Sequence, residues 1–406
     1  MDIAVVGAGL AGMAAGIELV GQGHQVTVLE ASDGPGGRVR TDVVNGFRLD
    51  RGFQILLEAY PAAQDILDYD KLDLQRFSPG ARIHLDGSFH RVGDPLREPA
   101  KLLDTLRAPI GSPIDKARIL AFRRAVNRGT LESVWTRPET TAMARLEDAG
   151  FSGRMIERFL TPLFAGITLD PALAGSSRVL EFVFRMLSAG DAAVPANGMG
   201  AIADQLAARL PAGSLRLSTP VREVTANQVT LEDGEQITAD QVVVATGQSE
   251  AARLTSAADR GWRGVTSVWF SAPEAPIEEP VLVLSAAGTD PINSLVVMSR
   301  VSNAYAPAGS TNVVVSSPVI RAGLVDDMRS KLGEWFGGQV DGWEVLRVDE
   351  IERAQPIQAV GLGARGPVKT ADGIWVCGDH TTDPSINGAL GSGQAIAREL
   401  SAASAA

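Results

Sequence analysis

The chain opens with MDIAVVGAGLAG (residues 1–12), and QVTVLE follows at residues 25–30. Residues 3–6 form a short apolar run, which predicts a buried strand, and residues 25–30 predict a second strand. Residues 10–22 predict a helix that carries small residues where it must pack closely. A strand, a helix and a strand within about thirty residues form a βαβ unit, so we expect an α/β fold.

The turn between the first strand and the helix is Gly7-Ala8-Gly9-Leu10-Ala11-Gly12, a GxGxxG sequence. In this context Gly7 allows a tight turn, Gly9 lets a pyrophosphate approach the backbone, and Gly12 lets the helix pack on the strand. The free N–H groups and the positive end of the helix favour phosphate. Glu30 ends the second strand, where a carboxylate accepts hydrogen bonds from ribose hydroxyls. We therefore predict a dinucleotide site that also includes Leu10, Ala11 and Ala31; the alternative is a glycine-rich turn with a surface glutamate.

A second GxGxxG sequence, GLGARG, occupies residues 361–366. No strand precedes it, and Pro367 and a strand follow it instead of a clear helix. Because the motif binds phosphate only between a strand and a helix, we interpret this segment as a loop. We expect one dinucleotide site.

Length and composition exclude several classes of protein. The 406 residues suffice for about two domains. The formal net charge of −11 argues against nucleic acid as a partner, because phosphate backbones require a concentrated positive surface. Cys377 is the single cysteine, and no His/Cys spacing suggests a metal site. No basic segment precedes the apolar N-terminus and no run of 18 apolar residues occurs, so we expect a cytoplasmic protein.

Further motifs stand at Gly36-Gly37-Arg38 with Thr41, at Asp50-Arg51-Gly52-Phe53-Gln54, and near the other end at Gly378-Asp379. Together with the GxGxxG sequence they resemble the signature of the flavin amine oxidase and phytoene desaturase superfamily, which includes protoporphyrinogen oxidase. Residues 159–170 (FLTPLFAGITLD) and 194–202 (VPANGMGAI) look like the desaturase and protoporphyrinogen oxidase branch. The resemblance implies FAD as the cofactor, and we expect it to be bound without a covalent link.

The resemblance also implies which residues lie along the cofactor. Backbone amides of Gly36 and Gly37 and the guanidinium of Arg38 would lie near the pyrophosphate, which suits the pairing of arginine with phosphate. Near the isoalloxazine ring it places Gly52, Phe53 and Gln54. Core packing alone is the alternative interpretation of this last segment.

Three more segments complete the implied FAD site. The backbone of Val221 would contact adenine, with Ala245 and Thr246 at the end of a strand below the cofactor; from the residues alone, both segments are simply good strands. Asp379 would meet the ribityl–phosphate part. The amides around Asn387, Gly388 and Ala389, at the start of a helix, would face the flavin N1/O2 edge, where a helix dipole stabilises negative charge.

Two features common among amine oxidases are missing. Ser385 or Ile386 stands where those enzymes carry an aromatic residue beside the flavin, and no lysine occurs between residues 117 and 330 to hold a water at flavin N5. We therefore favour an FAD-dependent enzyme that moves a hydride from a C–C or C–N bond to flavin N5, like phytoene desaturase or protoporphyrinogen oxidase. The alternatives are an amine oxidase that makes an imine and hydrogen peroxide, and a flavin-binding protein without turnover. No catalytic acid or base can be assigned.

The expected fold class is α/β, a two-domain flavoprotein with a Rossmann-like FAD-binding domain and a mixed α+β substrate domain. The FAD-binding domain would comprise residues 1–75, 196–250 and 351–406, and the substrate domain residues 76–195 and 251–350. The expected partners are a small, mainly apolar substrate and oxygen or a quinone-like electron acceptor. The basic amphipathic stretch at residues 116–128 would either contact a membrane surface or be a solvated helix.

Overall fold

The computed structural model describes the whole chain except residues 95–96, 287, 289, 363–365 and 406. Its first layer is a six-stranded sheet in the order β10-β2-β1-β14-β21-β20. All its strands are parallel except β20, which runs antiparallel to its neighbour. These strands are β1 (Asp2–Val6), β2 (Gln25–Leu29), β10 (Leu215–Arg216), β14 (Gln241–Val244), β20 (Val368–Lys369) and β21 (Trp375–Val376).

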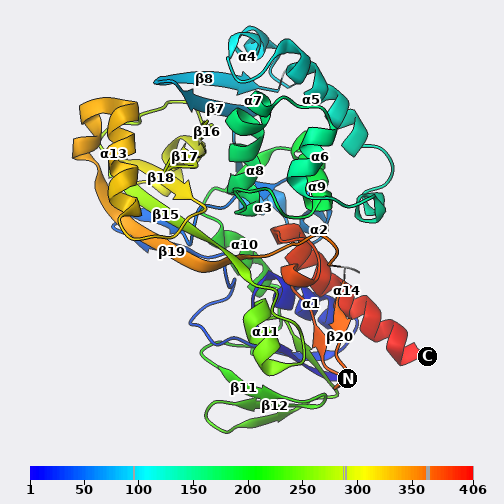
Figure 1. The fold of residues 1–406 in the computed structure, drawn as a ribbon. Coiled ribbons are helices and arrows are strands. Elements are labelled where there is room, and N and C mark those ends of the chain that lie inside the picture. Colours follow the sequence, from blue (N-terminus) through cyan, green and yellow to red (C-terminus); the bar gives the residue numbers. More distant parts are fainter. Residues whose placement is uncertain (95–96, 287, 289, 363–365, 406) are drawn as a thin grey trace.

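Both faces of this sheet are covered, which explains why β1 is almost wholly apolar. Ile3 and Val5 pack into the core that contains helix α1 (Leu10–Gly21), whereas Ala4 and Val6 pack into the core on the opposite face. Helix α14 (Ile386–Ala405) lies beside α1, as Figure 1 shows. A Cβ on Gly393 would lie 2.1 Å from the carbonyl oxygen of Ala11, so glycine lets the two helices touch.

The opposite face of the sheet carries a three-stranded sheet and α11 (Gln248–Leu254). The small sheet consists of β11 (Val221–Val224), β12 (Gln228–Leu231) and β13 (Gln236–Thr238), with a turn at Asp233-Gly234 between its last two strands. On the other face, a two-stranded ribbon, β3 (Thr41–Val44) and β4 (Phe47–Asp50), and helix α10 (Gly200–Ala207) contribute to the core that contains α1.

The second layer is a seven-stranded sheet in the order β19-β15-β18-β17-β16-β7-β8. Its strands are β7 (Gly80–Leu85), β8 (Ser88–Gly93), β15 (Trp262–Ala272), β16 (Leu282–Ser285), β17 (Ser294–Val297), β18 (Thr311–Ser317) and β19 (Glu344–Pro356). The β7–β8 hairpin turns at Asp86-Gly87, both with positive φ, as the sequence predicts. Val313 and Val315 of β18 pack with α13 (Leu324–Phe336), and Val314 faces the larger core behind.

Helices gather at the other side of this sheet, at the top of Figure 1. They are α4 (Leu102–Arg107), α5 (Pro113–Val126), α6 (Ala142–Asp148), α7 (Gly153–Met155), α8 (Thr161–Thr168) and α9 (Ser177–Ala189). A π-helical turn at Ile156–Leu160 precedes α8, where Pro162 supplies no backbone N–H. Shorter elements are α2 (Pro61–Ile66), α3 (Tyr69–Leu72), α12 (Met298–Val301) and a sheet of β5 (Leu56–Leu57), β6 (Leu74–Arg76) and β9 (Ala192–Pro195).

The predicted fold class is confirmed, with local differences. Strand β19 runs without a break from Glu344 to Pro356 because it pairs along nearly the whole of β15. Gly361 and Gly366 of the second GxGxxG sequence are outside any helix or strand, and residues 363–365 of it fall outside the described residues. None of the helices in the described part of the chain has both the length and the apolarity needed to cross a membrane.

Candidate active site

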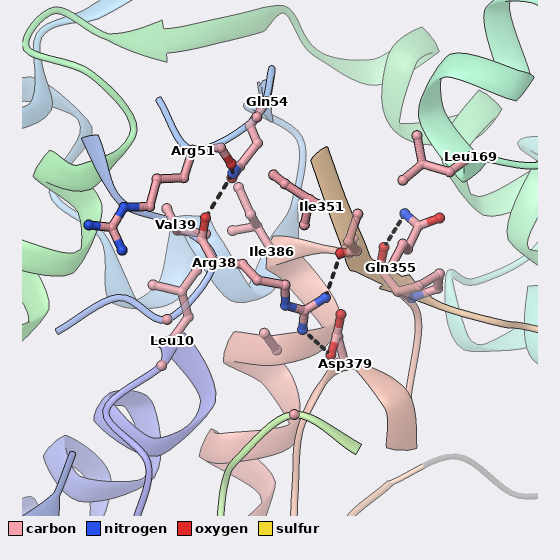
Figure 2. A pocket seen from close by; sticks show the side chains of 18 of the residues that line it. Leu10, Arg38, Val39, Arg51, Gln54, Leu169, Ile351, Gln355, Asp379 and Ile386 are labelled. Atoms are coloured by element: carbon pink, nitrogen blue, oxygen red, sulfur yellow. Dashed lines mark hydrogen bonds and ion pairs between the residues drawn. The ribbon is translucent and has the colours of Figure 1, made fainter. Parts of the chain in front are cut away.

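A cavity of about 580 Å³ lies where the two layers meet. This volume falls within the usual range for cofactor and ligand sites, about 300–1,000 Å³. One end is lined by the glycine-rich turn after β1, and the other end by α8, α9 and the seven-stranded sheet. Figure 2 shows side chains from distant parts of the chain converging on it, among them Leu10, Arg38, Gln54, Gln355 and Asp379.

The glycine-rich turn has the geometry that phosphate binding requires. Gly7 has a φ of +103°, and its amide donates to the carbonyl of Leu29 at 2.7 Å. A Cβ on Gly12 would lie 1.9 Å from the carbonyl oxygen of Gly7, so only glycine lets α1 begin here. A Cβ on Gly9 would meet no atom within 4 Å, because Gly9 borders the cavity. No side chain caps α1, so its first amides remain for a ligand, and this cradle fits a pyrophosphate.

Glu30 is held rigidly beside this turn. One carboxylate oxygen accepts the amide of Ala8 at 2.8 Å, and the other accepts the amide and the hydroxyl of Ser32 at 2.9 and 2.7 Å. Gly36, at a φ of +109°, returns the chain to the turn by donating its amide to the carbonyl of Ala8. The carboxylate therefore has a fixed position at the cavity edge, as a ribose-binding residue needs.

Arg38 and Asp379 form an ion pair in the cavity wall. The guanidinium Nη2 of Arg38 donates to Oδ1 of Asp379 at 2.7 Å, and Nη1 donates to the carbonyl of Ala354 at 2.9 Å (Figure 2). The guanidinium also lies 5.4 Å from the ring centre of Trp262. Asp379 is buried, while the Arg38 side chain is 37% exposed, so the arginine retains a face toward the cavity.

The segment Gly52–Gln54 is fixed by contacts with both layers. The Nε2 of Gln54 donates to the carbonyls of Arg38 and Arg51 at 2.8 and 3.0 Å, and Figure 2 shows the first of these bonds. The amide of Phe53 donates to Oγ of Ser267 at 3.4 Å. All three residues of the segment line the cavity.

A buried carboxylate supports this segment, and the sequence did not indicate its hydrogen-bond partners. Asp50 is fully buried at the end of β4 and accepts hydrogen bonds from the Thr41 hydroxyl at 2.5 Å, the Tyr305 hydroxyl at 2.6 Å and the Met199 amide at 2.9 Å. Burial is the largest influence on Asp50 and raises the pKa of its carboxyl, although the three hydrogen bonds oppose this change. Tyr305, which precedes β18 of the seven-stranded sheet, is thereby tied to β4, the strand before Gly52.

Most of the predicted cofactor residues line this cavity. They are Gly7, Gly9, Leu10, Ala11, Glu30, Ala31, Gly36, Gly37, Arg38, Gly52, Phe53, Gln54, Val221, Ala245, Thr246, Gly378, Asp379 and Ala389. Gly12, Asn387 and Gly388 do not border it. Asn387 accepts the amide of Ala62 at 3.1 Å, and a Cβ on Gly388 would lie 1.9 Å from the carbonyl oxygen of Asp383, so these two residues shape the start of α14.

The far half of the cavity could not be predicted from motifs. Its wall comes from α8, α9 and strands of the seven-stranded sheet, and its members include Leu163, Ile167, Leu169, Val179, Phe182, Val183, Leu282, Leu284, Asn293, Ser294, Ser316 and Ser317. Of these elements, only α8 lies in a segment, residues 159–170, that resembles the desaturase and protoporphyrinogen oxidase branch. Asp383 and Tyr60 also line the cavity and were missed.

Cys377 lies outside the cavity lining. Its thiol is fully buried in the main core, and burial raises its pKa to about 12. Such a thiol behaves as a small apolar group.

The fold and this site define an α/β protein whose cavity is lined by the glycine-rich turn after β1 and by α8, α9 and the seven-stranded sheet. The sequence model of the family described as flavin containing amine oxidoreductase matches residues 10–401. The chain belongs to this family, which confirms the resemblance found in the motifs and implies a flavin cofactor.

The relatives that this chain matches are named for reactions on different substrates. A phytoene dehydrogenase from Streptomyces griseus is 42% identical over 93 residues, and an L-amino acid oxidase from Bothriechis schlegelii is 36% identical over 105 residues. These segments cover 21% and 25% of this chain, but only 18% and 21% of those two proteins. The family is therefore shared, while the reaction is not decided by these matches.

Solved structures share the fold over nearly the whole chain. An oxidoreductase from Methanosarcina mazei has a TM-score of 0.76 at 18% identity, covering 98% of this chain and all of that one. A putrescine oxidase with bound putrescine has a TM-score of 0.71 at 18% identity, covering 99% of each chain. At such identities the likeness establishes the architecture alone.

Proposed function

We propose that this protein is an FAD-dependent oxidoreductase that removes a hydride from a C–C or C–N bond of a neutral, mainly apolar substrate, as in the phytoene desaturase and protoporphyrinogen oxidase branch. The observation that carries the proposal is the chemistry of the far half of the cavity. Every cavity-lining residue described on α8, on α9 and on the strands of the seven-stranded sheet is apolar or uncharged. A charged substrate would lose its hydration there without gaining an ion partner from these elements, which costs several kcal/mol.

The chain's own residues supply cofactor binding and orientation. The uncapped amides of α1 would receive the pyrophosphate, Glu30 the ribose hydroxyls, and Arg38 a phosphate oxygen. When bound, the flavin supplies the hydride acceptor. The buried thiol of Cys377 offers no attachment point, which supports binding without a covalent link.

The spacing of two aromatic residues at the cavity, Tyr60 and Phe182, argues against an amine held between their rings. Tyr60 and Phe182 stack with their ring centres 6.0 Å apart and an angle of 3° between the planes. A group held between two rings needs about 7 Å, twice the usual van der Waals distance. The pair therefore forms a wall and leaves no gap in which an amine could be sandwiched.

An amine oxidase is the second candidate, and Asp383 is the observation in its favour. This carboxylate borders the cavity and is the acidic residue of the DPS sequence just ahead of α14. A cationic amine could pair with it. However, the Ser385 hydroxyl already donates to one oxygen of Asp383, and the Asn387 amide lies 3.4 Å from the other.

Anaerobic mixing of the flavin-loaded protein with candidate substrates separates these functions. We expect terpenoids or porphyrinogens to bleach the visible flavin absorbance, and primary amines and amino acids to leave it unchanged. Bleaching by amines with peroxide release on adding air would establish the amine oxidase instead. A flavin that only dithionite reduces would indicate a binding protein without turnover. Adding oxygen or a quinone to the reduced protein then identifies the electron acceptor.

A further inference from the structure

We propose that the outward face of α4 and the first three turns of α5 docks on an anionic lipid membrane. We define this docking face by Leu102, Leu103 and Leu106 of α4 and by Ile114 and Leu120 of α5. The inference goes beyond the proposed oxidoreductase activity and does not depend on it.

Exposed apolar side chains are concentrated at this place. Thirteen large hydrophobic residues in the described chain are exposed, and the five of the docking face fall within 19 consecutive residues. Leu103 is 61% exposed and Ile114 is 63% exposed. Soluble proteins rarely gather such residues on one face unless the face meets a partner or a membrane.

The apolar face of α5 points outward as a regular stripe. Ile114, Ala117, Leu120 and Ala121 are exposed at helical spacing, while Phe122 and Val126 on the other side are buried. A solvated helix would show the reverse distribution, with polar residues outside. The basic stretch at residues 116–128 therefore has an exposed face that begins apolar and becomes basic only at Arg124 and Arg128.

The two helices form one fixed surface. The Nζ of Lys116 donates to the carbonyls of Leu106 and Ala108 at 2.8 and 3.1 Å, which closes the end of α4 against the first turns of α5. A capping box of Ser112 and Asp115 fixes the start of α5. Figure 1 places both helices at the top of the molecule, at the end remote from the N-terminus.

The charge around the docking face is opposite to that of the protein. Residues 101–128 contain seven basic and two acidic residues in a chain of formal net charge −11. Arg107, Arg124 and Arg128 are exposed and form no ion pair with another described residue; Asp104 is the exposed acid among them. Apolar side chains that enter the headgroup boundary, surrounded by basic residues that meet anionic lipid, are the mark of an interfacial helix.

A second copy of the chain fits this surface poorly. In a two-fold contact the same surface meets itself, so the basic residues around the docking face of one copy would meet the equally basic surface of the other. Like charges brought together in an interface oppose association. An anionic membrane instead complements both the apolar residues and the basic ones.

The position of the docking face would suit an apolar substrate. Phe122, on the inner side of α5, packs edge-on against Phe184 of α9 at 4.9 Å, and Phe184 stacks on Phe164 of α8. Helices α8 and α9 line the cavity. One layer of helices, α8 and α9, thus separates the docking face from the cavity.

Sedimentation with vesicles tests the proposal on the full flavin-loaded chain. We expect binding to phosphatidylcholine vesicles that contain phosphatidylglycerol, little binding to phosphatidylcholine alone, and weaker binding at high salt. The combined variant Leu103→Ser, Leu106→Ser and Ile114→Ser should bind at least about tenfold more weakly. Replacing Arg107, Arg124 and Arg128 by Gln should weaken binding about fivefold for each substitution.

A matched variant controls for general surface effects. Val43→Ser, Val345→Ser and Val348→Ser remove three exposed apolar side chains from β3 and β19, away from the docking face, and should leave vesicle binding unchanged. No binding of the natural chain to anionic vesicles, or equal binding by both serine variants, would overturn the proposal. A dimer without vesicles that only the Leu103, Leu106 and Ile114 variant abolishes would show that a second copy covers this face. Because sedimentation requires no turnover, these outcomes are independent of the reaction.

Discussion

The guanidinium of Arg38 lies 2.7 Å from the carboxylate of Asp379, across 341 residues of sequence. This contact joins the motif after the βαβ unit to the motif before α14, and both residues border the cavity. The ion pair thus brings two short motifs from distant parts of the chain together in one wall of the proposed FAD site.

Replacing Arg38 should therefore weaken FAD binding selectively. Loss of a charge-assisted hydrogen bond to phosphate corresponds to roughly a 10- to 100-fold weaker affinity. Titration of the apoprotein with FAD would measure the effect of Arg38→Ala. Arg40→Ala is the matched control, because Arg40 lies in the same loop but pairs with Asp33 outside the cavity lining. Equal affinities for the two variants would contradict the assigned role of Arg38.

Two glycines of the same motif should respond differently to alanine. Gly9→Ala places a methyl group in open space at a φ of −70°, so folding stability should change by less than about 0.5 kcal/mol while FAD affinity falls. Gly12→Ala forces a Cβ to within 1.9 Å of the Gly7 carbonyl oxygen, which should cost about 3 kcal/mol or more. Urea unfolding of both apoproteins, followed by FAD titration, distinguishes the effects. Unimpaired FAD binding by Gly9→Ala would contradict the assignment of the pyrophosphate to this turn.

The Tyr305 hydroxyl should stabilise the joint between the layers. Tyr305→Phe deprives the buried Asp50 carboxyl of one of its three donors, and we expect a loss of about 1–3 kcal/mol in the free energy of unfolding. Tyr69→Phe is a suitable comparison, since that hydroxyl makes only a 3.3 Å bond to the Glu58 carbonyl. If both variants unfold at the same urea concentration, Asp50 does not depend on Tyr305.

His380 should make stability depend on pH. The side chain is buried, neither ring nitrogen has a hydrogen-bond partner among the described atoms, and burial lowers the pKa of the imidazole, although Asp379 opposes this change. The unfolded chain then binds the proton more readily, so stability should be constant above about pH 6.5 and should fall as the pH decreases below it.

Each unit by which the pKa is lowered removes up to about 1.4 kcal/mol at acidic pH. His380→Phe should abolish this part of the decline while unfolding normally at pH 8. Unfolding midpoints measured from pH 8 to pH 5 give the comparison; parallel curves for the two proteins would refute the prediction.

The local part of the fold could be predicted from the sequence because its signals are local. The strand, glycine turn and helix of residues 3–22 depend on backbone conformations that neighbouring residues dictate, and Gly7 and Gly12 have the geometry expected of them. The Asp86-Gly87 hairpin was likewise predictable from its turn residues. The family resemblance singled out residues from distant parts of the chain, most of which line the cavity.

The far half of the cavity could not be predicted because its wall depends on long-range pairing. Leu282 and Leu284 reach the cavity because β16 pairs in parallel with β7, whose residues lie about 200 positions earlier. Asp50 and Tyr305 are 255 residues apart, and neither belongs to a motif that predicts the other. Asn387 and Gly388 remain predicted cofactor contacts. Their short-range packing around Asp383, which the sequence did not indicate, leaves them outside the cavity lining.

Denaturing the purified protein and identifying the flavin that it releases would show whether the cavity holds FAD without a covalent bond. We predict a yellow protein whose flavin appears in the supernatant as FAD after precipitation with acid. A colourless protein that does not take up added FAD would contradict FAD binding. Flavin that stays with the precipitated chain would contradict binding without a covalent bond.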